Sequence, residues 1–492
     1  MTGQVVFLIF LLPFSAAIVM PLLGNWRRAW CRPLALSAVC LMALSSLFSL
    51  YAVATQGPVR YALGGWAPPV GIVMILDGLS GLLAVTLSLV SLASLIFGGP
   101  ALPKDLGGKV VPYHTLVLLL ISALAGITLA GDLFNLFVFL EVSALCTYAL
   151  IGSAGGRALI AAFRYLMLGT IGASFYLLGV GYFYAATGTL NMEDFLHRLP
   201  DVLHSKAVLT GLIFIFLGLA IKAAIVPLHG WLPDAYSHAP DAVVPLLASA
   251  ITKVSLYAIT RVMFWVLGAA TLTYEFPLLF LFGWGGAVGA VVGAFLALTQ
   301  QDLRRMFAYG GISHVGLIVI GIAVGNKTGY AGGLFYLVND AVMQATLFFI
   351  AGLIAYRTGV RELSQLRNLW TQMPWTSTAL IVTALSMIGI PPTGGFFGKW
   401  YMVLGALEAK NYLAVAAILL STLLTLAYFV RIIERMFSEG TSDSSGASLV
   451  AEGPAEMRIS MAVLAASILL LGLFSDRIVG LILRSALPPG LG

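Results

Sequence analysis

Long apolar stretches, separated by short polar connections, run along almost the whole chain. A helix that crosses the hydrocarbon core of a bilayer needs about 20 mostly apolar residues. By that measure the pattern predicts fourteen spanning helices, near residues 4–24, 34–55, 74–98, 113–130, 132–152, 158–186, 207–235, 242–267, 277–299, 303–325, 329–354, 376–406, 411–437 and 459–483. The longest polar insert, 438–456, is rich in Ser, Gly and acidic residues, which is typical of a flexible connection. We therefore expect an all-α integral membrane protein without a soluble domain.

The composition agrees with this pattern and excludes other classes of protein. Only 9% of the 492 residues are charged and 60% are hydrophobic, whereas soluble proteins carry about 25% charged residues. A soluble enzyme, a disordered chain and a disulfide-rich secreted fold are therefore excluded. The sequence contains no basic tract for nucleic acid, no Gly-rich phosphate loop and no haem motif, and its three cysteines lack metal-ligand spacing. We expect no nucleic acid, metal or cofactor on this chain, and the sequence leaves open whether it belongs to an enzyme.

The basic residues of the connections predict the orientation. Fourteen Lys and Arg residues lie in the connections after odd-numbered spans and seven in the connections on the opposite side. The positive-inside rule then predicts a multi-pass protein of the cell (inner) membrane, with both termini outside and the Arg-rich connections in the cytoplasm.

Four charged residues lie at membrane depth, where a charge costs at least about 2.5–3.5 kcal/mol and needs a partner or water. They are Glu141 in the fifth span, Lys222 in the seventh, Lys253 in the eighth and Lys399 in the twelfth. A structural ion pair of Glu141 with Lys222 is one interpretation. However, three lysines against one glutamate favour at least one neutral lysine, and a lysine removed from water releases its proton more readily. These residues are therefore candidates for a proton relay.

Two spans are interrupted by helix-breaking residues, since proline removes a backbone donor and clashes with the preceding turn. The seventh span contains Pro227 and Pro233, which flank 228–232; the twelfth contains Pro391, Pro392, Gly394 and Gly395. A packing kink explains either interruption alone. Paired broken helices in two halves of a chain, however, are typical of inverted-repeat transporters. We expect inverted five-helix repeats over 113–267 (helices 4–8) and 277–437 (helices 9–13), preceded by 1–112 and followed by 438–492.

Further candidates for the relay are three histidines and one aspartate. The pKa of histidine, near 6.5, suits a proton shuttle. His229 and His238 lie near the end of the seventh span, His314 lies in the tenth and Asp340 in the eleventh. Each has a plainer interpretation as a hydrogen-bonding group between helices.

Together these segments resemble the antiporter-like subunits shared by respiratory complex I, Mrp-type cation/proton antiporters and membrane-bound hydrogenases. The resemblance runs from about Asp77 to Arg435 and rests on four stretches: FVFLE, KAAIVPLHGWLPDAYSHAP, QDLRRMFAYGGISHVG and GIPPTGGFFGKW. It implies fourteen helices with two inverted five-helix repeats, and other membrane subunits as partners. The expected cargo is the proton, with sodium as a second candidate.

The resemblance also implies roles for the charged residues. Glu141 and Lys222 would form the ion pair that gates proton movement, Lys253 and His314 would belong to a central polar axis, and Lys399 would exchange a proton with the outer side. The twelfth-span lysine resembles both the N-type subunit of complex I and the D-type subunit of Mrp antiporters, whereas the M-type usually has glutamate there. The chain also lacks the long lateral helix typical of the L-type and Mrp A-type subunits, and we expect it to be most like the Mrp D type. The eleventh span, NDAVMQATLFF, departs from the pattern because it places Gln344 where many relatives have lysine. In one alternative, water, His314 or Asp340 carries the proton between Lys253 and Lys399. In the other, only one of the two half-channels of this subunit conducts protons.

Two other functions compete with an Mrp-type proton-translocating subunit. The first is a proton-pumping subunit of a redox-driven complex, such as complex I or a membrane-bound hydrogenase, in which this chain still carries protons but holds no redox centre. The second is a non-conducting structural subunit. A stand-alone solute transporter is a more distant alternative, because no span supplies a cluster of recognition side chains.

Overall fold

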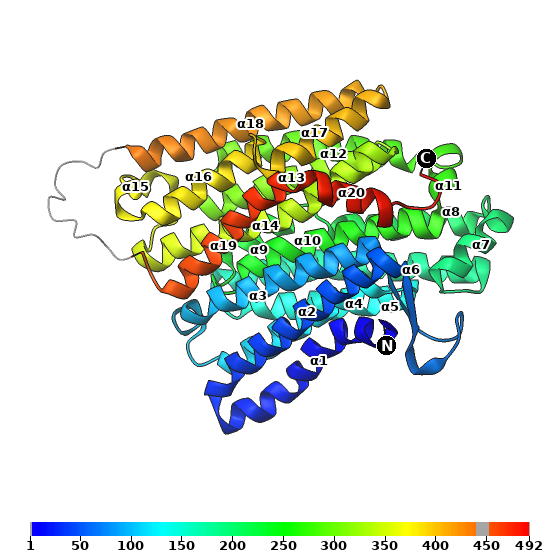
Figure 1. The fold of residues 1–492 in the computed structure, drawn as a ribbon, viewed down its shortest axis with the longest axis horizontal. Helices are drawn as coiled ribbons and strands as arrows, with labels where there is room; N and C mark the ends of the chain where they lie inside the picture. Colours follow the sequence, from blue (N-terminus) through cyan, green and yellow to red (C-terminus); the bar gives the residue numbers. More distant parts are fainter. Residues whose placement is uncertain (1, 439–451, 492) are drawn as a thin grey trace.

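The computed structural model describes residues 2–438 and 452–491, and the described chain is a bundle of long helices (Figure 1). Twelve helices of this part are long and apolar enough to cross a membrane. They are α1 (Thr2–Trp26), α2 (Cys31–Gln56), α3 (Gly78–Leu106), α4 (Val110–Leu129), α5 (Leu133–Gly152), α6 (Arg157–Thr187), α10 (Val244–Arg261), α12 (Leu278–Thr299), α13 (Leu303–Ala323), α14 (Lys327–Thr358), α18 (Tyr412–Phe437) and α19 (Ala455–Leu473). The all-α membrane class is confirmed. Most of the predicted flexible insert, 439–451, lies outside the described residues.

The seventh and twelfth predicted spans are each divided into two helices. The seventh consists of α8 (Lys206–Lys222) and α9 (Trp231–His238), and the twelfth of α16 (Pro374–Ile388) and α17 (Gly394–Glu408). Each part is shorter than the roughly 20 residues that a membrane requires. If each pair crosses the membrane together, twelve long helices and two broken ones make fourteen spans, and that total stays a prediction. The two interruptions predicted from proline and glycine are present.

The first interruption differs in one detail from the prediction. It covers residues 223–230, so Pro227 lies within it while Pro233 is the third residue of α9. The expectation that Pro233 closes the break was therefore wrong. A proline in the first turn of a helix is tolerated because the backbone N–H at that position has no intrahelical partner.

Short elements complete the described chain. An antiparallel hairpin pairs β1 (Val59–Ala62) with β2 (Val73–Leu76), so the third span begins at Gly78 and not near residue 74 as predicted. The others are η1 (Arg28–Trp30), η2 (Leu63–Gly65), α7 (Met192–Val202), the π-helical turn η3 (Val262–Leu267), α11 (Ala269–Tyr274), η4 (Leu363–Gln365), α15 (Leu369–Gln372) and α20 (Ser475–Ser485). Helix α7 lies in the polar stretch 191–206, between α6 and α8.

Two matching helix starts support an internal repeat. Asp132 caps α5, and the next backbone N–H, from Leu133, donates to the carbonyl of Leu190 after α6. In the second half Asp302 caps α13, and the N–H of Leu303 donates to the carbonyl of Arg361 after α14. If successive helices cross the membrane in alternate directions, a repeat with an odd number of spans ends on the side opposite to its start. The second five-span repeat then begins on the opposite side and is inverted relative to the first. The residue limits of the repeats stay predictions.

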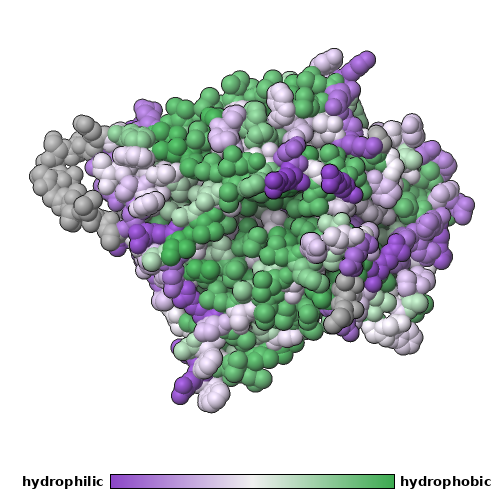
Figure 2. Space-filling model, viewed as in Figure 1, coloured by the Kyte–Doolittle hydropathy of each residue, from purple (hydrophilic) through white to green (hydrophobic). Residues whose placement is uncertain are grey.

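The most enclosed helices are α10, α13 and α14, which contact one another. Every residue in the most apolar stretch of α14 is buried, whereas only 33% of that stretch is buried in α1 and 39% in α18. Figure 1 accordingly shows α10 and α14 inside the bundle, with α1 and α18 at opposite edges. The outer face is apolar across its middle and more hydrophilic toward its two ends (Figure 2). The charged and titratable side chains in the middle of these helices, Lys253, His314 and Asp340, are thus removed from both water and lipid.

Candidate functional site

The first pair of charges joins α5 to the end of α8. Lys222 is the last residue of α8, and its Nζ donates to Oε1 of Glu141 at 3.1 Å. The lysine side chain is 5% exposed and the glutamate side chain 28% exposed. At the same helix end, the indole N–H of Trp231 donates to the carbonyl of Ile221 at 2.9 Å. The break thus places an ammonium group beside a carboxylate, and Trp231 of α9 adds a second donor to the Ile221 carbonyl, which also accepts the backbone N–H of Ala224 at 3.2 Å.

The second cluster lies where α10, α13 and α14 meet. The Nζ of Lys253 is 2.7 Å from Oδ2 of Asp340, and the other carboxylate oxygen lies 2.8 Å from Nδ1 of His314. All three side chains are at most 2% exposed. Lys253 also donates to the carbonyl of Ala248 at 3.0 Å, and the Tyr336 hydroxyl lies 3.2 Å from the His314 ring. Asp340 therefore contacts both a cation and an imidazole in a sealed site.

Lys399, on α17, has a different environment. Its Nζ donates to the carbonyls of Met387 and Ile388, at 2.9 and 3.1 Å, and to the Thr422 hydroxyl at 3.1 Å. An ammonium has three donors, and these three acceptors use them all. Within residues 2–438 and 452–491 no carboxylate lies within ion-pair distance of it. The two carbonyls belong to the C-terminal end of α16, where the helix dipole favours a positive charge.

The glycines after the second break let α17 approach its neighbours. A Cβ at Gly394 would collide with the Asn339 side chain of α14, and one at Gly395 with the Ser386 carbonyl of α16. Both contacts would be shorter than real Cβ atoms show. Glycine at these positions therefore sets the position of α17 and of Lys399 five residues beyond Gly394.

The predicted histidines fall into two groups. His314 belongs to the central cluster, as described. His229 lies in the 223–230 interruption with its ring edge-on to Tyr309, and Nδ1 of His238 bonds to the carbonyl of Asp234 at 2.9 Å. Among the described residues neither is bonded to Lys222 or Lys253, so their part in a relay stays a prediction.

Gln344, which stands where many relatives have lysine, lies on α14 one turn after Asp340 and is 1% exposed. Its amide faces Gly311 of α13, and within the described chain its Nε2 has no hydrogen-bond partner. In that same part of the chain, no direct hydrogen bond or ion pair joins Lys222 to Lys253, or His314 to Lys399. The candidate residues thus form three separate centres, and a proton needs water to pass between them.

A further buried charge pair was not predicted. Arg261, at the end of α10, donates to Oδ2 and Oδ1 of Asp77 at 2.6 and 2.9 Å, and its Nε lies 3.1 Å from the Tyr257 hydroxyl. It also stacks on Trp265 at 4.4 Å. Arg261 is two turns beyond Lys253 on the same helix. The sequence does contain a signal, an arginine inside a span eight residues after Lys253, but it does not identify Asp77 as the partner.

The described residues hold no group of three or more His, Cys, Asp or Glu side chains close enough to bind a metal ion. The side chains that form the three centres are carboxylate, ammonium and imidazole groups, which bind and release protons.

The middle of the chain matches a known family of membrane proteins. The family described as "NADH:quinone oxidoreductase/Mrp antiporter, TM" matches residues 130–425. The chain belongs to this family. The resemblance predicted from four sequence stretches is confirmed, and all the relay candidates lie within the matched range.

Relatives of two kinds are similar over most of the chain. The N-type component of the NADH-quinone oxidoreductase of Desulforudis audaxviator is 41% identical, with 99% of both chains covered. The D-type component of the Na(+)/H(+) antiporter of Alkalihalophilus pseudofirmus is 32% identical, with 80% of this chain and 79% of that one covered.

Solved structures share the fold. A chain of the membrane-bound sulfane sulfur reductase, an archaeal respiratory complex, superposes with a TM-score of 0.91 at 29% identity, covering 98% of this chain and 96% of that one. A chain of the Mrp complex from a Dietzia species gives 0.87 at 25% identity, with the same coverage of each. These neighbours are subunits of multisubunit membrane assemblies.

Proposed function

We propose that this chain is a proton-translocating, antiporter-like subunit of a multisubunit membrane complex. The observation that carries the proposal is the sealed Lys253–Asp340–His314 cluster on the three most enclosed helices. A buried ion pair is weak evidence for stability, because desolvation of the charges offsets most of their attraction. Its position between two broken helices, each carrying a lysine, is explained by transport.

The proposed transfer begins at the Glu141–Lys222 pair. When this pair opens, the Lys222 ammonium loses its nearest carboxylate. Lys253 passes its own proton on toward the His314 imidazole and then, as a neutral amine, takes up the Lys222 proton through water. Asp340 balances the charge on Lys253, and the His314 imidazole has one nitrogen that accepts a proton and one that donates it. Lys399 releases its proton to the outer side or takes one from it. Each step moves one proton from one basic group to the next, without redox chemistry in this chain.

The first test measures proton transport by the complex reconstituted in proteoliposomes, normalised to the amount of assembled complex. Glu141→Ala and Lys222→Ala should each abolish transport while the complex still assembles. The matched control is Asp194→Asn, which breaks the exposed Asp194–Arg198 pair on α7 and should leave transport unchanged. Full transport in both relay variants would overturn the proposal.

A non-conducting structural subunit is the competing function from a different class. It predicts that Lys253→Ala and Lys399→Ala leave transport unchanged, provided that the complex assembles. Loss of transport in an assembled complex would exclude it.

The driving partner is of one of two types. The N-type relative and the sulfane sulfur reductase neighbour favour a redox-driven complex, whereas the D-type relative and the neighbour in the Mrp complex favour an Mrp-type cation/proton antiporter. The role proposed for this chain is the same in both. Co-purifying subunits distinguish them: iron–sulfur subunits identify the redox-driven complex, and small membrane subunits the antiporter.

The proposed location is the cell (inner) membrane, with both termini outside and the Arg-rich connections in the cytoplasm. The excess of basic residues on one side supports this orientation. Labelling of single cysteines at Lys410 and at Arg357 by a membrane-impermeant reagent tests it, since only the first should react from outside.

A further inference from the structure

An apolar groove opens on the membrane-facing side of the bundle between α3 and α19. Its volume is about 450 Å³, within the range of roughly 300–1,000 Å³ typical of small-molecule sites. Leu82 and Leu89 of α3 form one wall, and Val463 and Leu471 of α19 form the other. Almost no polar surface lines it, so its occupant contributes hydrocarbon there.

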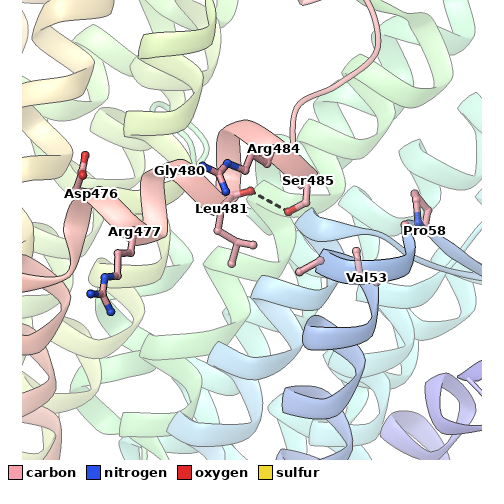
Figure 3. Close-up of a pocket in the computed structure, with 10 residues that line it drawn as sticks. Val53, Pro58, Asp476, Arg477, Gly480, Leu481, Arg484 and Ser485 are labelled. Carbon is pink, nitrogen blue, oxygen red and sulfur yellow. Dashed lines mark hydrogen bonds between the residues drawn. The ribbon is translucent and has the colours of Figure 1, made fainter.

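One end of this groove meets a cavity of different chemistry. This cavity, of about 670 Å³, lies between the end of α2 and helix α20, and Leu481 lines both spaces. Val53 and Pro58 contribute from the α2 side, while Arg477 and Arg484 bring two guanidinium groups from α20 (Figure 3). The two spaces together are apolar along their length and cationic at one end.

The positive charges at this end of the cavity come from helix α20, and they are accessible from outside the bundle. Arg477, Gly480 and Arg484 are three and four residues apart, which places them on one face of the helix. Both arginines are exposed, and in the part of the chain that the structure describes neither forms an ion pair. Asp476 also lines the cavity, but Figure 3 shows its carboxylate directed to the opposite side of the helix from the Arg477 guanidinium. A Cβ at Gly480 would meet no atom within 4 Å, so the space between the arginines is empty of side chains.

We propose that this combined site binds an anionic phospholipid, with an acyl chain in the groove and the phosphate between Arg477 and Arg484. Charge complementarity selects this occupant. Two exposed cations beside an apolar groove match a lipid that has a negative headgroup on a hydrocarbon tail. An apolar helix of a partner subunit would fill the groove but leave both guanidinium groups without a counter-ion.

The proposed lipid lies against the helix that carries the central acid. Val338 and Val342 of α14 line the groove, and they are two residues before and two after Asp340. They are 7% and 8% exposed, on a helix whose most apolar stretch is otherwise enclosed. The acyl chain therefore covers the side of α14 that faces the membrane.

Native mass spectrometry of the purified complex tests this site directly. The complex is titrated with phosphatidylglycerol or with phosphatidylcholine, which share acyl chains but differ in charge. We expect tighter binding of phosphatidylglycerol, reduced about fivefold by Arg477→Gln or by Arg484→Gln, because each basic residue near an anionic headgroup contributes about that factor. Gly480→Leu should reduce it without changing the charge, because the leucine side chain occupies the open space between the two arginines.

Two matched controls keep the test specific. Gly181→Leu fills a comparable open position on α6 beside an apolar surface pocket without basic residues, and Lys206→Gln removes one exposed positive charge elsewhere. Neither should change the preference for phosphatidylglycerol. Gly480→Ala, which adds only one methyl group, should retain binding and shows that α20 tolerates substitution. Equal binding of the two lipids by the unmodified complex would overturn the proposal. So would an unchanged preference in Gly480→Leu, or cross-linking of a Gly480→Cys variant to a partner subunit in place of lipid.

Discussion

The two broken helices carry the same side chain in two different electrostatic settings. At the first break Lys222 faces the carboxylate of Glu141, and the Trp231 indole donates to the Ile221 carbonyl at the end of α8. At the second break Lys399 itself takes the free carbonyls of Met387 and Ile388. One ammonium is balanced by a side-chain carboxylate on another helix, while the other is held by the backbone carbonyls of a helix end.

This difference suggests a division of labour along the proposed path. A carboxylate on a separate helix can open and close against Lys222, so its position controls whether that lysine keeps its proton. The carbonyls at the end of α16 provide a fixed site, which suits exchange of protons with the outer side. Between them, Asp340 joins Lys253 to His314 on the most enclosed helices, so the central charge is the one with the least access to water.

The largest effect on stability is expected at the central pair. Asp340→Asn leaves the Lys253 ammonium buried without a counter-ion, which should lower the free energy of unfolding by about 3–5 kcal/mol. Equilibrium unfolding of the purified chain in detergent measures it. Replacing both partners, as in Lys253→Met with Asp340→Leu, should restore most of the lost free energy of unfolding, because neither charge of this pair is then present. An Asp340→Asn variant as stable as the unmodified protein would contradict the assignment of a charged Lys253.

The next prediction tests whether Lys399 acts as a fixed positive charge or as a group that releases a proton. Lys399→Met should cost about 1–3 kcal/mol of stability, because two carbonyls lose their donor. Lys399→Arg keeps a cation there but does not release its proton. Both variants should lose proton transport in proteoliposomes. Transport by the arginine variant at the unmodified rate would show that Lys399 acts only as a fixed charge.

A smaller stability change is expected at the first pair. Glu141 is 28% exposed, so water partly replaces the lost interaction when Glu141→Gln is made. The free energy of unfolding should fall by about 1–2 kcal/mol, less than for Asp340→Asn, although transport is lost. A loss as large as that of Asp340→Asn would mean that the first pair is a structural element and not a gate.

The smallest effect is expected at the exposed pair on α7. Asp194 and Arg198 are one turn apart, with side chains 29% and 47% exposed, whereas the Lys222 side chain of the first pair is only 5% exposed. Pairs with a solvent-exposed cation of this kind contribute about 0–1 kcal/mol. Asp194→Asn should change stability by no more than that, measured in the same unfolding experiment. A larger change would show that unfolding in detergent does not separate buried from exposed pairs.

The positions of the charges were predictable from the sequence, whereas most of their partners were not. A charge inside a long apolar stretch stands out, which identified Glu141, Lys222, Lys253 and Lys399. The pairing of Lys253 with Asp340 joins helices far apart in the chain, and Asp340 alone is equally compatible with a helix–helix hydrogen bond. Arg261 with Asp77 was missed for the same reason, since the two residues are 184 positions apart.

Among the helix boundaries, too, one could be predicted from a local sequence signal and another could not. The apolar strand 73–76 is indistinguishable from the start of a membrane helix by hydropathy, so the third span was predicted too early. Asp77 and Ser80 form a capping box that marks the true start, and this local signal was available. At the first break, by contrast, Pro233 is compatible with both a gap and a first helical turn, and packing of α9 decides between them.

The most direct test of the central claim is proton transport by the complex that carries Lys253→Met together with Asp340→Leu. Apolar replacement of both partners of a buried pair is about neutral for stability, so this variant should fold and assemble. The proposed path predicts that the assembled, stable complex translocates no protons in proteoliposomes. Transport at the unmodified rate by that complex would contradict the claim that protons pass through the centre formed by Lys253 and Asp340.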